Sequence, residues 1–313
     1  MEITDWYLPE KDPASGHVFI GGKPQVLSAD QQSQAKLLVQ HCKESHQERP
    51  ARRGWMATIA GTTYRVQRIP EQLDGTAIYA LRCIDDRSRN LVDLGMSPRV
   101  AELLNTPTLK DGIVLVTGST GSGKTTTAAT MIAERLRNHG GFAITIEDPI
   151  EHLLGGYYPD SGGLCYQVCL DAENDDFAPA IREALRSAPA MVQPMLLIGE
   201  VRGNEGAAEL IRAGASGYLV VSTIHGASIP DAIRRLIAIS QTKEAADMAA
   251  AALRLVIHQE ITHHRLKTTV LYVNTPGIQS KIRTGKLESL TSDMQYQATQ
   301  LRLERSLIHP PPQ

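Results

Sequence analysis

The sequence predicts an α/β fold whose main domain is a largely parallel sheet with helices on both faces, preceded by a smaller α+β domain. From about residue 112 onward, short apolar runs alternate with helix-length segments, which is the pattern of parallel strands joined by crossover helices. One of these runs leads directly into a glycine-rich loop and then a helix-forming segment. Up to about residue 105, strand-like runs are separated by turn residues instead. We therefore expect residues 1–105 to form the N-terminal domain with its linker, and residues 106–313 to form the larger domain.

The composition excludes several classes of protein. The chain has 313 residues, with 42% hydrophobic and 21% charged residues, which is typical of a soluble globular protein with room for two cores. A net charge of −2 and an aromatic content of 4% disfavour direct binding of nucleic acid, which needs cations for phosphates and rings for stacking. Four scattered cysteines favour reduced thiols in a cytoplasm over a disulfide framework. No apolar run approaches the roughly 18 residues of a spanning helix, so we expect membrane association to be peripheral at most.

The expected elements of the N-terminal domain follow from its apolar periodicity and turn residues. We expect one helix and three strands, divided by Gly61 and by a turn at 70–75. A polar stretch at 85–90 and a further helix near 98–104 follow, and we expect the join between the domains in this region. The first helix is expected at 35–42 and the strands at 55–60, 63–68 and 77–83.

The larger domain is expected to contain five apolar strands. Each is short and bounded by helix-length segments, so most of them should run parallel. In such sheets ligands bind at the carboxyl ends of the strands, which directs attention to the residues that follow each run. The expected strands are 113–116, 143–146, 195–198, 218–222 and 268–272.

The strongest chemical signal is a complete G-x-x-x-x-G-K-S/T motif between the strand at 113–116 and a helix expected at 126–137. Its glycines let backbone N–H groups turn toward phosphates, and the helix N-terminus adds a positive dipole end. We expect Lys124 to reach the β- and γ-phosphates of ATP and the Thr125 hydroxyl to bind Mg²⁺. The predicted nucleotide-binding residues are Gly118, Ser119, Thr120, Gly121, Ser122, Gly123, Lys124, Thr125 and Thr126.

Three further candidates stand at the ends of expected strands. Glu147 and Glu200 each follow an apolar run, so a parallel sheet would bring both near the γ-phosphate. There a carboxylate can orient or deprotonate the attacking water, or hold Mg²⁺. His225 ends another run and is a candidate sensor of the γ-phosphate. The alternative is that these are solvated strand-end residues, or a histidine of the core or surface.

These pieces, in this order, resemble the secretion-ATPase superfamily and especially the PilT-like pilus-retraction motors. Residues 118–125 are similar to its Walker A motif and 145–151 (TIEDPIE) to its Asp box. Residues 199–202 (GEVR) are similar to its Walker B segment and 223–225 to its His box. The resemblance extends over roughly residues 55–295.

The resemblance implies a RecA-like ATPase domain, a small PAS-like N-terminal domain, and a homo-hexamer with nucleotide bound between subunits. It further implies a cytoplasmic protein recruited to the inner membrane by a platform protein. Glu200 then corresponds to the Walker B acid that binds Mg²⁺ or polarises water, and Glu147 to the Asp-box acid; which of the two is the base stays open. Arg65 and Arg82 occupy positions similar to N-domain arginines that approach the phosphates, where an arginine stabilises transition-state charge. Solvated strand-end arginines are the alternative.

The chain also departs from the pattern of the pilus motors. Tyr218 stands where the family usually has histidine, and residues 188–190 read Ala-Pro-Ala where it usually has Asp-Pro-Asp. Gly203 after GEVR is more similar to the type IV secretion ATPases. The expected function is a hexameric, Mg²⁺-dependent ATPase motor of a pilus or of a type II or type IV secretion system. A type IV secretion traffic ATPase is the main alternative, followed by a P-loop kinase and a nucleic-acid translocase.

Overall fold

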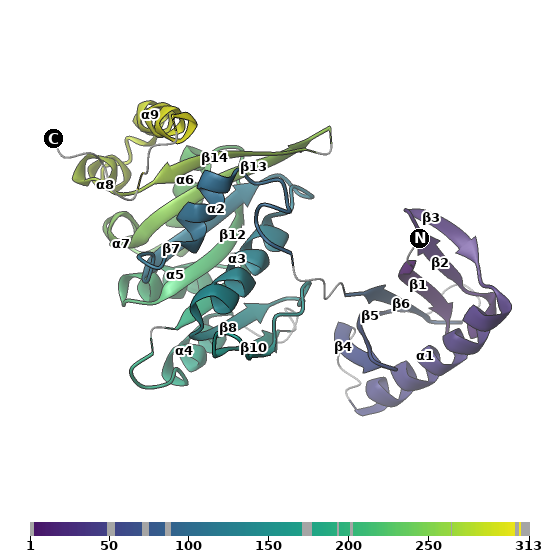
Figure 1. Ribbon diagram of the computed structural model, residues 1–313. Coiled ribbons are helices and arrows are strands. Elements are labelled where there is room, and N and C mark those ends of the chain that lie inside the picture. Colours follow the sequence, from purple (N-terminus) through teal and green to yellow (C-terminus); the bar gives the residue numbers. More distant parts are fainter. Residues whose placement is uncertain are drawn as a thin grey trace. The chain divides into compact units, whose positions relative to one another are not determined.

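The computed structural model describes residues 3–48, 54–70, 75–84, 89–170, 177–192, 194–200, 203–263, 265–303 and 307 (Figure 1). The chain divides into two compact units, and among the described residues Ile84 belongs to the first and Arg89 to the second. Each unit has a sheet of its own. Parts of the expected turn at 70–75, of the polar stretch at 85–90 and of the GEVR segment lie outside the described residues.

The first unit is a six-stranded antiparallel sheet with one long helix against it. Its elements are β1 (Ile3–Pro9), the 3₁₀ turn η1 (Pro13–Ser15), β2 (His17–Ile20), β3 (Lys23–Val26), α1 (Ala29–Glu48), β4 (Gly54–Ile59), β5 (Thr62–Ile69) and β6 (Ile78–Cys83). The strand order is β3-β2-β1-β6-β5-β4. The three strands expected here are confirmed as β4, β5 and β6, whereas β1 to β3 were not predicted.

Helix α1 begins with a capping box and packs through one stripe. The Ser28 N–H donates to Gln31 Oε1 at 2.8 Å, and the Gln31 N–H donates to Ser28 Oγ at 3.3 Å, so two N-terminal donors are satisfied. Its buried residues recur at helical spacing and join Trp6 in the core. They are Ala35, Leu38, Val39 and Cys42. The helix expected at 35–42 is therefore confirmed as the buried middle of a longer one.

The second unit is built on an eight-stranded mixed sheet. Its elements are α2 (Pro98–Asn105), β7 (Gly112–Gly118), α3 (Lys124–His139), β8 (Phe142–Glu147), β9 (Gly156–Tyr158), β10 (Gly163–Cys169), α4 (Phe177–Arg186), β11 (Met195–Glu200), α5 (Asn204–Ala215), β12 (Leu219–His225), α6 (Ile229–Ser240), α7 (Ala245–Ala252), β13 (Leu253–Thr262), β14 (Arg265–Tyr272), α8 (Pro276–Arg283), the 3₁₀ turn η2 (Leu287–Ser289) and α9 (Leu290–Arg302). The order is β14-β13-β7-β12-β11-β8-β10-β9, parallel except at the two edges, where β14 and β9 pair antiparallel. All five expected strands are present, while β9, β10 and β13 were not predicted.

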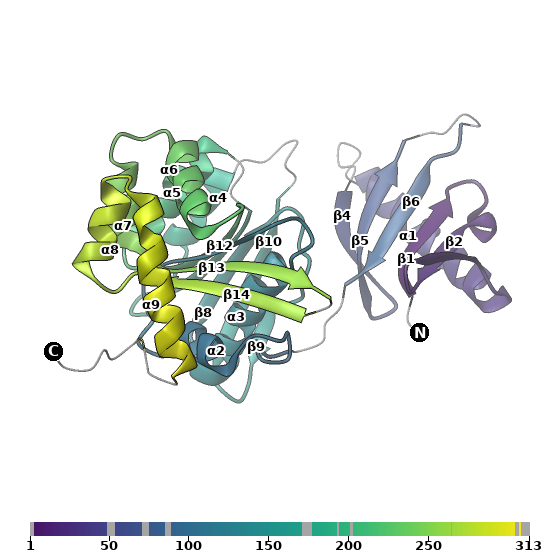
Figure 2. The same cartoon turned by 90° about the horizontal axis from the view of Figure 1, so that it is seen from above.

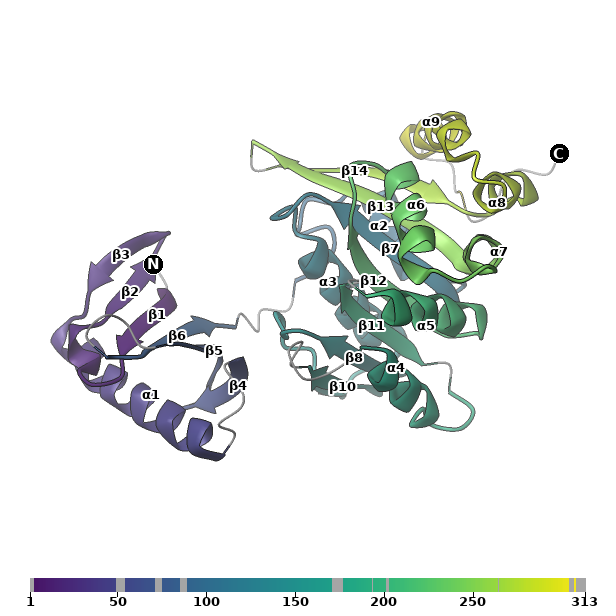
Figure 3. The same cartoon turned by 180° about the vertical axis from the view of Figure 1, so that it is seen from behind.

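Helices cover both faces of this sheet, which places its core on both sides of β7. Ile113 and Leu115 pack into one cluster with residues of α5 and α6. Val114 and Val116 pack into the other cluster with residues of α2 and α3. Figure 3 shows α4, α5 and α6 together on the first of these faces. The expected layering is confirmed, because a strand buried on both faces reads as a continuous apolar run.

The buried Arg135 stabilises the segment between α2 and β7 through hydrogen bonds to its backbone carbonyls. Arg135 of α3 donates from Nη1 to Leu104 O at 3.0 Å and to Thr106 O at 2.9 Å, and from Nη2 to Leu109 O at 2.6 Å. Burial lowers the pKa of Arg135 to about 10. These carbonyls lie at and beyond the end of α2, so the arginine ties that end to α3.

Helix α9 runs beside the edge strand β14 (Figure 2). The buried Gln297 accepts from the Tyr272 N–H and donates to the Tyr272 carbonyl, both at 2.8 Å. A side-chain amide thus satisfies edge-strand groups that no neighbouring strand pairs. Among the described residues, none of the helices has both the length and the apolarity that a membrane crossing needs.

Candidate nucleotide site

The predicted phosphate loop, residues 118–125, joins β7 to α3 and depends on its glycines. Gly118, Gly121 and Gly123 have φ angles of 153°, 77° and 80°, which side chains rarely adopt. A Cβ at Gly118 would also overlap the backbone oxygen of Gln259. Gly123 is the N-cap of α3 and makes no side-chain cap hydrogen bond, so the positive dipole end of the helix lies directly at the loop.

Lys124 reaches across this loop. Its side chain is largely buried, with 8% of the residue exposed. The ammonium Nζ donates to Ser119 O at 2.8 Å and lies 3.4 Å from Nδ1 of His225. The Ser119 carbonyl and His225 of β12 thus position the Lys124 ammonium beside the loop, where phosphates bind in sites of this kind.

The parallel strands bring the predicted acids and histidine to the same edge of the sheet. His225 is paired in register with Gly118, since β12 lies next to β7. Glu200 is paired with Thr223 after a register shift in β11, and Glu147 ends β8, the next strand along. Thus all three lie at the carboxyl edge, at the end of the sheet from which the loop emerges.

His225 connects the loop lysine to one of the acids. Its Nε2 lies 3.0 Å from Glu200 Oε1. An ammonium group can only donate, so Nδ1 of the histidine accepts from Lys124 and the proton of the neutral ring sits on Nε2. The ring then donates to Glu200. The result is a continuous chain of polar contacts, Lys124–His225–Glu200, across β12.

The two acids have different surroundings. Glu147 is 1% exposed and accepts from Thr145 Oγ1 at 2.6 Å and from Gln167 Nε2 at 3.3 Å. The side chain of Glu200 is 23% exposed. Glu147 is therefore held by side chains of its own strand and of β10, whereas Glu200 faces the loop side through His225.

Cys165 lies on β10, close enough to Glu147 for the charge of that carboxylate to act on its thiol. Burial, with a smaller contribution from the charge of Glu147, raises the pKa of the Cys165 thiol to about 12. The thiol is therefore neutral at physiological pH, and it is excluded as a nucleophile or thiolate ligand there.

The two predicted arginines belong to the first unit and face each other there. Arg65 on β5 and Arg82 on β6 are cross-strand partners, so their side chains are on the same face of the sheet. Arg82 Nε lies 2.7 Å from Asp5 Oδ1, and this hydrogen bond raises the pKa of Arg82. The side chain of Arg82 is still 61% exposed. The structure therefore brings both cations together on one surface.

Three residues in contact with the site were missed in the sequence. Thr145 and Gln167 hold Glu147, and Gln259 of β13 contacts the loop at Ser122. Thr145 stands two residues before Glu147 in the TIEDPIE motif, which was a usable signal. Gln167 and Gln259 lie on unpredicted strands, so the strand-end argument that found the acids did not reach them.

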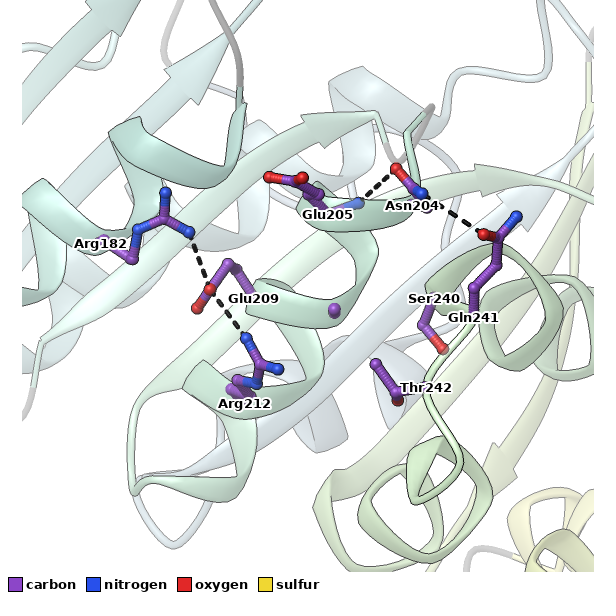
Figure 4. Close-up of a pocket in the computed structure, with 9 residues that line it drawn as sticks. Arg182, Asn204, Glu205, Glu209, Arg212, Ser240, Gln241 and Thr242 are labelled. Atoms are coloured by element: carbon purple, nitrogen blue, oxygen red, sulfur yellow. Dashed lines mark hydrogen bonds and ion pairs between the residues drawn. The ribbon is translucent and has the colours of Figure 1, made fainter.

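A separate polar cavity of about 370 Å³ lies between α4, α5 and the end of α6 (Figure 4). Glu209 accepts there from Arg182 and from Arg212, each at 2.9 Å. Two arginines and two glutamates, the second being Glu205, line the cavity, so its formal charges cancel. A polyphosphate has no electrostatic preference for such a cavity, and none of its lining residues belongs to the site described above.

Comparison with known proteins decides the family. The family model described as type II/IV secretion system protein matches residues 36–288. The chain belongs to this family. Over 239 residues it is 30% identical to the type IV pilus retraction ATPase PilT of Pseudomonas aeruginosa, covering 74% of this chain and 66% of PilT. Identity to the uncharacterized protein YggR of Escherichia coli (strain K12) is also 30% over 239 residues, covering 74% of this chain and 70% of YggR.

Further matches cover shorter spans or rest on structure. The type II secretion system protein E of Pseudomonas aeruginosa is 40% identical over 164 residues, which cover 50% of this chain and 30% of that protein. The crystal structure of the pilus retraction motor PilT with bound ADP superposes with a TM-score of 0.73 at 27% identity, covering 94% of this chain and 86% of that one. The Legionella pneumophila ATPase DotB shares the fold, with a TM-score of 0.69 at 20% identity over 92% of this chain and 83% of DotB. The predicted membership of the secretion and pilus ATPase superfamily is confirmed.

Proposed function

We propose that this chain is a Mg²⁺-dependent P-loop ATPase motor that couples ATP hydrolysis to pilus dynamics or to secretion. The observation that carries the proposal is the Lys124–His225–Glu200 chain beside the glycine loop. It links a cation for the phosphates to an acid for the attacking water, which are the two groups that phosphoryl transfer to water requires. In this proposal, residues 106–313 are a RecA-like ATPase domain, and residues 1–105 are a PAS-like domain with a linker that includes α2.

The loop residues have distinct roles in this proposal. Backbone N–H groups of residues 118–126 cradle the phosphates, and Lys124 neutralises charge on the β- and γ-phosphates. The residues present also fit Mg²⁺: Thr125 stands half-buried in the first turn of α3, and the Glu200 carboxylate is partly exposed at the same edge of the sheet. Thr125 and Glu200 would hold the ion, which would supply charge neutralisation for the phosphates.

Two carboxylates are candidates for the water. The partly exposed Glu200 can accept a hydrogen bond from the attacking water while His225 holds its other side. Glu147, held by Thr145 and Gln167, is the second candidate. His225 contacts both Lys124 and Glu200. If Lys124 moved onto a phosphate, its contact with His225 would change, and the hydrogen bond from His225 to Glu200 would change with it. This contact supports a role for His225 as sensor of the γ-phosphate.

We further propose a homo-hexamer in which Arg65 and Arg82 approach nucleotide held by an ATPase domain. The pairing of these two cations on one exposed surface supports the assignment. Their action across subunits is testable in rings that mix Arg82→Ala chains with Lys124→Ala chains. If Arg82 acts on nucleotide held by a neighbouring subunit, the ATPase rate of the mixed rings should differ from the weighted average of the rates of the two variants measured alone.

The control is the same mixture made with Arg99→Ala, because Arg99 is an exposed cation of α2 that forms an ion pair with Glu102 of its own helix. Activity of the Arg82 mixture that equals the weighted average of its parents at every ratio would exclude action across the interface.

Assembly should respond to nucleotide. We expect a ring of six chains that is loose or monomeric alone and tightens with ATP, whose charge bridges basic groups of adjacent subunits. Mass measurement in solution with a non-hydrolysable ATP analogue should show particles of about six chains. The mass of the particles formed by the Lys124→Ala variant should not change when the ATP analogue is added. A strict monomer or two-fold dimer at every concentration would contradict the motor and favour a P-loop kinase.

The machine that the motor drives is proposed at the level of its class. The relatives named above serve pilus retraction and type II secretion, and Gly203 supports type IV secretion as the alternative. The proposed partner is an inner-membrane platform protein, reached from the cytoplasm by peripheral association. The near-neutral charge supports a motor without direct nucleic-acid binding.

A further inference from the structure

Gln259 lies on β13 and contacts the phosphate loop from one side of β7, whereas His225 lies on β12, on the other side of β7. Gln259 follows His258, which is paired in register with Thr117 of β7. Strand β7 lies between β13 and β12, so Gln259 and His225 flank the loop from opposite sides. The Gln259 side chain donates from Nε2 to the backbone oxygen of Ser122 at 2.5 Å. Its own backbone oxygen lies so close to Gly118 that a Cβ there would overlap it.

The bond to Ser122 determines the direction of a neighbouring N–H group. The peptide group is planar and trans, so the carbonyl of Ser122 and the N–H of Gly123 point in opposite directions. Gly123 has a φ of 80° and no side chain, and the conformational freedom of glycine would allow this peptide group other orientations. An amide donor on the carbonyl therefore sets the direction in which the Gly123 N–H points.

Packing alone does not explain a glutamine at this position. Gln259 is 1% exposed, and its Oε1 has no hydrogen-bond partner among the described residues. A buried amide that leaves its oxygen unsatisfied destabilises the fold relative to an apolar side chain of similar size. Ser122 Oγ is likewise a buried polar atom with no hydrogen-bond partner in the described part of the chain. The polar contact with the loop is the feature that an apolar residue would not reproduce.

We infer that Gln259 is a positioning residue of the nucleotide site, whose amide orients the Ser122–Gly123 peptide so that the Gly123 N–H points at the bound phosphates. Gln259 acts through the loop and does not itself touch the nucleotide. The inference rests on the proposed function, because it requires phosphates at residues 118–125. Lys124 acts similarly on the other side, where its bond to Ser119 O orients the peptide between Ser119 and Thr120.

The test compares two substitutions by their affinity for a fluorescent ADP across pH. Gln259→Ala removes the donor, and we expect affinity to fall about tenfold at every pH. Gln259→Glu removes the donor only while the carboxyl is ionised, and its charge then also repels the phosphates. Burial raises the pKa of a carboxyl, so from about pH 8 down to about pH 5 the new side chain should become protonated and donate again. Affinity of the Gln259→Glu variant, relative to wild type at each pH, should therefore recover toward acid pH while that of Gln259→Ala does not.

Two controls separate this inference from the proposed function. Failure of wild type to bind ADP, or undiminished binding by Lys124→Ala, would refute the nucleotide site itself. With that site intact, Glu260→Gln should bind as wild type does, because Glu260 is the exposed next residue of the strand. Wild-type affinity of Gln259→Ala, or equal losses for both variants at all pH values, would overturn the positioning role. So would unfolding of both variants in circular dichroism, which would assign Gln259 to the core.

Discussion

Replacing Lys124 by alanine is expected to abolish tight binding of ATP. A hydrogen bond to a charged group contributes about 1.5–3 kcal/mol, and Lys124 is proposed to contact two phosphates, so affinity should fall at least about a hundredfold. The loop at 118–125 has no second lysine or arginine that could replace the charge. Titration with a fluorescent ATP analogue measures the loss.

The matched control for this variant is Lys110→Ala. Lys110 is exposed and precedes β7 by two residues, at the opposite end of the strand from the loop. It should bind nucleotide as wild type does. Undiminished affinity of the Lys124→Ala variant would refute the assignment of the loop, and with it the role given to the contact between Lys124 and His225.

Replacing Glu200 by glutamine should leave ATP bound and remove most turnover. The oxygen of the new amide still accepts from His225 Nε2, so the 3.0 Å contact survives and only the charge is lost. General-base catalysis contributes roughly a hundredfold or more, and we expect kcat to fall by at least that factor. Phosphate release under saturating ATP, together with nucleotide affinity, gives both quantities.

Two further variants sharpen this result. Glu205→Gln changes an exposed acid in the first turn of α5 and should keep wild-type turnover. Glu147→Gln distinguishes the two candidate bases, because the acid that deprotonates or orients water is the one whose loss lowers kcat with binding retained. Loss of ATP binding by Glu200→Gln together with turnover would instead give Glu200 a structural role.

The elements that the sequence predicted are those with strong local patterns. The central strands β7, β8, β11 and β12 are buried on both faces, so each is an apolar run that stands out from its surroundings. Two of the missed strands, β3 and β10, lack this property, whereas β13 is buried on both faces but was missed for another reason. Strand β3 has four residues, all exposed, and includes Pro24. Strand β10 is buried on one side only, and β13 follows the alanine-rich α7 without a glycine or proline between them.

The sequence by itself determined the loop and the candidate acids. The residues of the predicted phosphate loop are contiguous, and the predicted chemistry depends on glycine conformations and a helix start that are encoded locally. Glu147, Glu200 and His225 were equally visible, since each ends an apolar run in a sheet expected to be parallel.

Only the tertiary structure decided which of these groups touch. Lys124, His225 and Glu200 form one chain because β12 inserts between β7 and β11, and Gln259 meets Ser122 because β13 pairs with β7 on its other side. Sheet neighbours here are separated by up to about 140 residues in sequence, as the bond from Gln259 to Ser122 spans 137. Strand order and register arise from packing the whole sheet against its helices, and no local run of residues encodes them.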